Sequence, residues 1–393
     1  MSSGFLTKIV LSFLSLATAS AGAFAQVVQP GTQTNGGESN NIVTAVPFLL
    51  ITPDARAGSM GDAGVAIQPD ANAMSINPSK IAFLDRQYGF SVSYSPWLKA
   101  LVPDINLAYL SGFYKLDESN TIGSSLRFFS LGEIQFVDIN QQDLGIYSPN
   151  ELAFDVTYAK RFGESFSLGT ALRYIRSSLS SGQFVAGQEI RAGSALAVDI
   201  SAYYKKPTVL FGTDAIVSGG INISNIGTKI SYVSGGGGKN FLPANLKIGG
   251  ASTFLIDDFS QFTFALDLNK LLVPTQPVYD GEGKIIAGKD PDRSVPSGIF
   301  GSFSDAPGGF SEELKEVNIA AGMEYWYNQQ FAFRAGYFYE NPGKGNKRYF
   351  TVGAGLKYNV FNIDFSYLMA NAQKSALTNT LRFTLLFNFG DAK

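Results

Sequence analysis

The chain has 393 residues, of which 45% are hydrophobic, and its formal net charge of −2 argues against a nucleic-acid partner. It contains no cysteine and no histidine, which excludes disulfides, thiol catalysis, Ser-His-Asp hydrolysis and metal sites built on these side chains. We therefore predict no catalytic residue, no cofactor and no metal site.

The first 25 residues have the pattern of a secretory signal peptide. Their only charged side chain is Lys8, an apolar stretch follows over residues 9–19, and a small-x-small run ends at Ala25. The apolar stretch is too short to span a bilayer as a helix. Residues 26–41 are rich in Gly, Gln, Asn and Thr, and we predict a flexible leader because they offer too little apolar surface to order by themselves.

Residues 42–87 lack regular alternation and are punctuated by Pro, Gly, Asp and Asn. Irregular backbone survives at membrane depth only where protein or water satisfies its hydrogen bonds. We therefore expect this segment to lie inside a barrel as a hatch, or plug. The hatch residues that the pattern singles out are Asp54, Arg56, Gly58, Gly61, Asp62, Gly64, Asn77 and Pro78.

From residue 88 onward, apolar and polar side chains alternate in stretches of about ten residues, the pattern of a transmembrane β-strand. In 380–389, for example, Leu381 and Phe383 share one face and Arg382 lies on the other. The predicted fold class is all-β: a 14-stranded antiparallel transmembrane β-barrel over residues 88–393. The candidate strands are 88–95, 104–114, 121–131, 151–161, 166–177, 192–205, 209–224, 243–256, 260–270, 316–326, 330–340, 349–358, 361–369 and 379–389.

The connections between the candidate strands alternate in length. Joins after even-numbered strands are brief, as at 162–165 and 205–208, and joins after odd-numbered strands are longer, as at 132–150 and 271–315. Outer-membrane barrels have short periplasmic turns and longer outer loops. The longer joins are therefore predicted to face outward, and both termini are predicted to be periplasmic.

When the more apolar face of each strand is assigned to lipid, ten charged side chains fall on the opposite face, five basic and five acidic. A charge facing lipid near the midplane costs roughly 2–4 kcal/mol, which explains this segregation. The balance of signs argues against a pore that selects one ion charge. The set is interpreted either as a pairing network that fills the lumen and holds the hatch, or as a polar ligand path. These lumen charges are Arg127, Asp155, Arg173, Asp199, Lys247, Asp267, Glu324, Arg334, Asp364 and Arg382.

Two outer joins carry more apolar surface than solvated loops need. In 95–103 the candidate contacts are Trp97, Leu98 and Leu101, and Trp97 belongs either to an outer aromatic girdle or to a partner-contact surface. Long apolar loops often fold over a barrel mouth or dock a protein. The candidate contacts in 271–315 are Val278, Tyr279, Ile285, Ile286, Ile299, Phe300, Phe303 and Phe310.

Adjacent carboxylates occur at 257–258 and 312–313, which fall in a tight turn and in the long 271–315 join. A pair of carboxylates is one arrangement that could support acid–base chemistry. In a turn or a loop a solvated role is expected instead, so neither pair is assigned a catalytic function.

Parts of the sequence resemble two known families. The pattern Ala-Arg-Ala-Gly, Gly-Asp-Ala-Gly and Asn-Pro within 46–84 resembles the N-terminal hatch of FadL-type outer-membrane proteins, which have fourteen strands. Residues 91–117, together with 125–134 and 171–179, resemble the PorV family of the type IX secretion system, also called LptO.

This resemblance implies a non-enzymatic role in the outer membrane of a Gram-negative, Bacteroidetes-like bacterium. The partners that it implies are outer-membrane lipid, the large translocon barrel, the C-terminal signal domains of secreted cargo, and an attachment complex with a PorU-like sortase, to which cargo is shuttled. Two alternatives are kept: a FadL-like transporter of hydrophobic small molecules, and a lipid A O-deacylase. Because histidine is absent, any link to lipid A deacylation is expected to be indirect.

Overall fold

The computed structural model describes residues 39–97, 104–137, 143–179, 184–185, 188–233, 238–280, 282–370, 377 and 379–391. The predicted signal peptide, nearly all of the predicted leader, Leu98 and Leu101 lie outside the described residues. The chain divides into two units, Met1–Ser39 and Asn40–Lys393. The second unit contains the elements described below.

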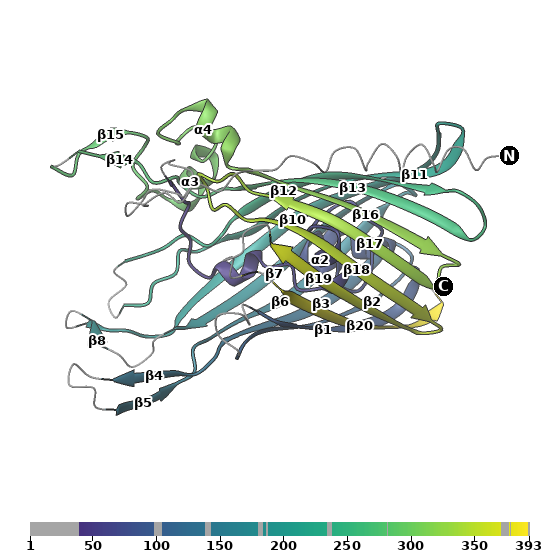
Figure 1. The fold of residues 1–393 in the computed structure, drawn as a ribbon, viewed down its shortest axis with the longest axis horizontal. Coiled ribbons are helices and arrows are strands. Elements are labelled where there is room, and N and C mark those ends of the chain that lie inside the picture. Colours follow the sequence, from purple (N-terminus) through teal and green to yellow (C-terminus); the bar gives the residue numbers. More distant parts are fainter. Residues whose placement is uncertain are drawn as a thin grey trace, which may run out of the picture. The chain divides into compact units, whose positions relative to one another are not determined.

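Fourteen strands form one closed barrel in which every neighbouring pair is antiparallel, and β1 pairs with β20 to complete the ring (Figure 1). This confirms the predicted fold. Among the described residues, no helix combines the length and the apolar character needed to cross a bilayer. The barrel strands are β1 (Arg86–Pro96), β2 (Ile105–Lys115), β3 (Asn120–Leu131), β6 (Asn150–Phe162), β7 (Phe166–Ser178), β10 (Gly193–Leu210), β11 (Thr213–Gly227), β12 (Asn245–Leu255), β13 (Ser260–Leu271), β16 (Val317–Tyr327), β17 (Phe331–Tyr339), β18 (Arg348–Tyr358), β19 (Phe361–Ala370) and β20 (Thr380–Asp391).

Strand β20 has the two faces that its alternation predicts. Phe383 is 46% exposed on the outer face, whereas Arg382 is 1% exposed on the inner face. At the closing seam Phe387 pairs with Phe90 of β1, and their rings stack with centroids 4.8 Å apart. The apolar side chains thus cover the outside of the barrel, and the ring of strands is closed at this seam.

The hairpin of β10 and β11 turns later than the sequence predicts. We expected a turn at 205–208, but β10 continues through this range and the turn consists of Phe211 and Gly212, whose φ angles are 54° and 80°. Pairing between β10 and β7 ends at Tyr204, so the part of β10 that contains Pro207 pairs only with β11. A proline is tolerated there because one side of the strand has no partner. The predicted turn at 205–208 is therefore wrong.

The long joins contain secondary structure that the sequence pattern did not reveal. Each of these elements is shorter than the stretch needed to recognise a period, so they were interpreted as loop. Three joins contain small strand pairs, and the join between β13 and β16 also contains two helices. These elements are β4 (Ile134–Val137) with β5 (Asp143–Tyr147), β8 (Phe184–Val185) with β9 (Gln188–Glu189), β14 (Val278–Tyr279) with β15 (Ile285–Ala287), α3 (Val295–Gly301) and α4 (Phe310–Lys315).

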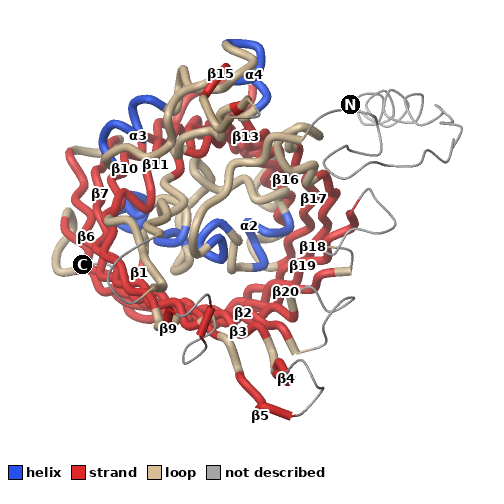
Figure 2. Tube along the Cα trace, turned by 90° about the vertical axis from the view of Figure 1, so that its left-hand side faces the viewer, coloured by secondary structure: helices blue, strands red, loops and turns tan. Residues whose placement is uncertain are grey.

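The segment before β1 lies within the ring of strands (Figure 2). It folds into four short helices that are hydrogen-bonded to inward-facing side chains of the barrel, and its boundaries at 42–87 remain a prediction. Its helices are η1 (Pro47–Leu50), α2 (Ala55–Ser59), η2 (Ala73–Ser75) and η3 (Pro78–Phe83). We call residues 42–87 the hatch.

The hatch runs from one end of the barrel to the other. Asn40, just before it, bonds to Gly343 and Gln276, which lie in two long joins, at 3.0 and 3.2 Å. At the opposite end, Leu84 O accepts a hydrogen bond from Lys115 beside a short turn. The described chain therefore starts at the long-loop end, whereas β20 ends at the short-turn end. The placement of both termini on the periplasmic side stays a prediction, because residues 1–38 lie outside the described residues.

Candidate functional site

The hatch approaches the inner wall most closely where glycine leaves room. Gly61 has a φ of 68°, and its N–H donates to the Thr351 hydroxyl at 2.8 Å, which donates in turn to Ser59 O at 2.9 Å. At Gly336 of β17, an added Cβ would lie 2.1 Å from the Gly61 nitrogen. A side chain at Gly336 would therefore force the hatch away from the wall.

Three predicted hatch residues act locally on the fold. Asp54 caps α2 by accepting a hydrogen bond from the Ala57 N–H at 2.8 Å. Asn77 caps η3 by accepting one from the Ser79 N–H at 3.2 Å, and Pro78 begins that helix. Asn77 also contacts the wall, since its Nδ2 donates to Ala202 O of β10 at 3.2 Å.

Three predicted lumen charges form one buried cluster around Arg173 of β7. Its Nε lies 2.6 Å from Asp155 Oδ1 of β6, and its Nη2 lies 3.1 Å from Asp199 Oδ2 of β10. No described carboxylate pairs with Arg127 of β3, which instead donates to the backbone oxygen of Leu49 at 2.7 Å. Arg127 thus fixes the first helix of the hatch to the wall.

A second buried cluster joins the hatch directly to the barrel through Glu324 of β16. Arg56 of the hatch places Nη2 2.8 Å from Glu324 Oε1, and Arg334 of β17 places Nε 2.6 Å from Glu324 Oε2. Arg334 also binds Asp364 of β19 at 2.6 Å, and Arg56 also binds Asp70 at 3.1 Å. Each guanidinium therefore has two carboxylates, as buried charges require.

Two further lumen charges hold the middle of the hatch. Asp267 Oδ2 of β13 accepts the N–H of Gly64 at 2.7 Å. Arg382 of β20 pairs with Asp62, with Nη1 3.5 Å from Oδ1, and its side chain lies directly against Gly58. Nine of the ten predicted lumen charges thus contact another charge or the hatch backbone, and Lys247 forms no hydrogen bond or ion pair with any described residue.

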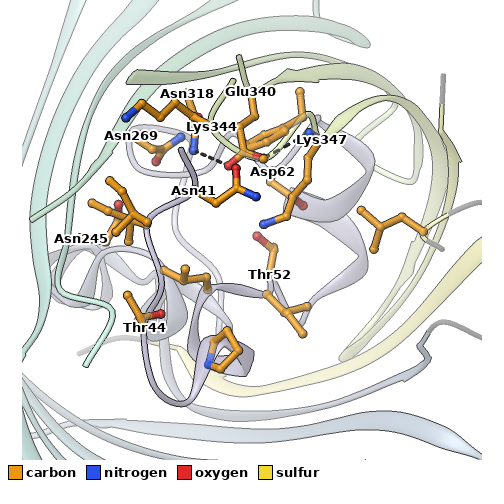
Figure 3. A pocket seen from close by; sticks show the side chains of 18 of the residues that line it. Asn41, Thr44, Thr52, Asp62, Asn245, Asn269, Asn318, Glu340, Lys344 and Lys347 are labelled. Atoms are coloured by element: carbon orange, nitrogen blue, oxygen red, sulfur yellow. Dashed lines mark hydrogen bonds between the residues drawn. The ribbon is translucent and has the colours of Figure 1, made fainter. Parts of the chain in front are cut away.

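A pocket of about 490 Å³ remains in the lumen on the long-loop side of the hatch (Figure 3). Amide side chains such as Asn41 and Asn318 line it together with Lys247 and Lys347, and Figure 3 shows Lys347 and Thr52 facing the same space. Among the described residues, no group of three or more carboxylates is arranged to hold a metal ion. Apolar side chains such as Trp97 and Phe338 share this lining, so the pocket is of mixed polar and apolar character.

Trp97 lies inside the barrel mouth, which corrects both interpretations of it as an outer residue. It is 9% exposed, packs in a buried apolar cluster with Phe48 of the hatch, and lies with its ring 5.7 Å from the guanidinium carbon of Arg382. Its orientation follows from the strand, since Ser93 and Ser95 also point inward and a side chain two residues later continues on the same face. That alternation was the signal that could have placed it.

The join between β13 and β16 carries the exposed apolar surface that the sequence predicts. Phe300, Phe310 and Ile286 are 79%, 76% and 63% exposed. Val278, Tyr279 and Phe303 are about half exposed, and Ile285 and Ile299 are partly buried. We call this surface the apolar loop face.

A buried ion-pair network anchors this join to the barrel mouth. Lys270 of β13 donates to Glu313 at 2.9 Å and to Glu316 at 2.6 Å, and Lys344 donates to Glu316 at 2.9 Å. Partial burial opposes ionisation of Glu313, but hydrogen bonds from backbone N–H groups and from Lys270 outweigh it and hold the pKa of Glu313 below its ordinary value. Glu313 is buried, so its predicted solvated role is wrong. No local pattern in the sequence indicates this network, because its members come from three separate segments.

Comparisons with known proteins agree with this architecture. The family model described as "Type IX secretion system protein PorV" matches residues 34–278. A search of curated proteins finds no match. Among solved structures, the Pseudomonas putida toluene transporter TodX is similar with a TM-score of 0.52 and 13% identity over 86% of this chain and 98% of that chain. A TodX deletion mutant described as a monoaromatic hydrocarbon channel is similar with a TM-score of 0.51 and 13% identity over 86% and 99%. These likenesses show a shared fold.

Proposed function

Because the chain belongs to the family of the type IX secretion system protein PorV, we propose that it binds the C-terminal signal domains of secreted cargo at its apolar loop face. As an outer-membrane component of that system, it would receive cargo beside the large translocon barrel and shuttle it to the attachment complex with its PorU-like sortase. The long joins would face the cell surface and the short turns the periplasm.

The observation that carries this proposal is the exposure of large apolar side chains on an anchored loop. Phe300 and Ile286 are 79% and 63% exposed, although the loop that bears them is fixed by buried ion pairs. Exposed apolar patches on a fixed frame mark sites of protein association. A preorganised loop also loses less conformational entropy when a partner binds.

The lumen supports a docking role more than transport of a hydrophobic small molecule. A FadL-like transporter would need an apolar pocket above residues 56–60 and a lateral gap in the wall. Instead, Met60 packs on Gly322, and the backbone ladder is continuous around all fourteen strands. We propose that the hatch keeps the lumen closed, and we assign no catalytic role.

The experiment introduces Ile286→Asp and Phe300→Asp together, and follows a secreted cargo with its native signal domain. Cargo is expected to accumulate in the periplasm, because a charge on each exposed side chain removes the apolar contact without touching the ion pairs that anchor the loop. Deletion of 278–310 should give the stronger form of the same defect. The matched control is Phe211→Asp, since Phe211 is 96% exposed but lies in a turn at the other end of the barrel.

Surface display of cargo at the normal level, with barrel abundance unchanged, would refute the assignment of the loop. Purified protein in detergent should also retain an isolated cargo signal domain, and the double variant should not. A periplasmic defect without loss of this binding would mean that the loop contacts the translocon or the attachment complex instead.

A further inference from the structure

A groove of about 260 Å³ lies between helix α4 and the outer wall of the barrel. Outward-facing side chains of β12, β13 and β16 form its floor, and Phe303, Phe310 and Leu314 form its roof. Phe310 and Leu314 are four residues apart and therefore share one face of α4. The floor residues are Leu246, Ile248, Leu268 and Val317.

The charged side chains that border the groove are already paired with each other or with a neighbour. Lys270 and Glu313 bind each other at 2.9 Å, and Lys270 also binds Glu316 at 2.6 Å. Both Lys270 and Glu313 are buried. The groove therefore offers apolar surface and no free charge, so water or a polar ligand would gain little there.

The floor of the groove is continuous with the surface of the barrel that faces lipid. Ile248 and Leu268 are 47% and 45% exposed on the outer face, and they lie two residues further from the long-loop end of their strands than Leu246 and Lys270, which also line the groove. Because the groove opens onto this surface, the hydrocarbon chains of lipid are the first molecules that would contact it. Its volume exceeds the roughly 150 Å³ of an engineered apolar cavity that accepts benzene.

We propose that this groove holds an acyl chain of a bilayer lipid, clamped between α4 and the strands β12, β13 and β16. Phe310 and Leu314 would then face hydrocarbon, whereas Glu313 on the other side of the same helix fixes α4 to Lys270. Their high exposure in the protein alone, 76% and 58%, is what a surface covered by lipid requires.

The absence of cysteine makes a direct test possible, because a single introduced cysteine can carry the only fluorophore. Leu314→Cys is labelled with bimane and reconstituted into phosphatidylcholine vesicles with dibrominated acyl chains. Leu266→Cys, 52% exposed on the outer face of β13 and outside the groove, serves as the lipid-facing control. Phe300→Cys, 79% exposed in the join between β13 and β16 and also outside the groove, serves as the water-facing control. Phe310→Cys repeats the measurement from the other end of α4 in case one variant fails to insert.

The expected result is that labels at Leu314 and Phe310 are quenched by brominated chains as strongly as the label at Leu266 and are protected from aqueous iodide. The label at Phe300 should show the opposite behaviour. Quenching by iodide in place of brominated chains would mean that the groove is filled with water, and would overturn the proposal. Protection from both quenchers would mean that protein covers the groove, and would overturn it equally.

Discussion

Substitution of Glu324 by Gln should release the hatch from the wall, because it removes the charge that two buried guanidiniums share. Arg56 and Arg334 lie 2.8 and 2.6 Å from its oxygens, and all three side chains are buried. Removal of one partner from a buried ion pair costs about 3–5 kcal/mol. Each arginine keeps a second carboxylate, so we expect a loss near the lower limit, about 3 kcal/mol, or roughly a hundredfold in the docking equilibrium.

Trp326 is a suitable probe, since Arg334 lies 5.4 Å from its ring centre. Urea titration of Glu324→Gln in detergent micelles, followed by tryptophan fluorescence, should show an early transition that the parent protein lacks. Single-channel recordings in planar bilayers should show increased conductance, because a displaced hatch opens the lumen.

A double-mutant cycle isolates the contact between the hatch and the wall. Arg56→Gln alone should also destabilise, but the double variant Glu324→Gln with Arg56→Gln should lose about 1–3 kcal/mol less than the sum of the two, since the buried charges no longer lack partners. Additive losses would refute the reasoning, because they would mean that the two side chains do not stabilise each other.

Three further outcomes follow from the same contacts. Gly336→Leu should raise conductance because its side chain would overlap the hatch backbone, whereas Gly250→Ala, whose Cβ would meet only a wall oxygen at 3.7 Å, should leave conductance unchanged. The pKa of Glu313 in the folded protein is lowered from 4.5, so its pairing with Lys270 stabilises the loop above pH 4.5 and is lost as the pH falls through the pKa of the folded state. Limited proteolysis of the parent protein should therefore show the loop opening only in acid. In Lys270→Met, the loop should be cleaved already at neutral pH. An epitope inserted before Ser39 should bind antibody on intact cells, and an epitope accessible only after lysis would contradict the path of the hatch.

The barrel could be predicted because a bilayer imposes a simple rule on every strand. Side chains that face the lipid must be apolar, so the alternation at 380–389 could be recognised in the sequence and Arg382 could be placed on the inner face. The one misplaced turn lies where β10 extends past β7. In this extension β10 pairs with β11 alone, so its sequence is less constrained. The predicted join at 205–208 falls in this extension.

The candidate site could be predicted only in part, because its contacts join segments that are distant in sequence. The sequence pattern predicted that each of these charged side chains points into the lumen. Which carboxylate pairs with Arg56, however, depends on the path of the hatch through the lumen. Likewise, Lys270 lies on the outward face of its strand, where an unpaired charge would be costly. Its pairing with Glu313 and Glu316 depends on how the long loop folds back, so the strand pattern alone could not predict it. Trp97 was the avoidable error, since the serines before it set its direction.

A network of charged side chains at the barrel mouth connects the start of the hatch with the apolar loop face. Glu312 accepts hydrogen bonds from both Asn40, just before the hatch, and Lys344, which also binds Glu316 beside α4. The start of the hatch and the apolar loop face are therefore held by the same cluster of charges. If a partner that docks on the loop pulls Glu312 or Glu316 away, Asn40 loses its contact as well, so docking and the position of the hatch should respond together. Lys344→Met should weaken both at once, measured as cargo binding and as conductance, whereas independent changes would separate the two functions.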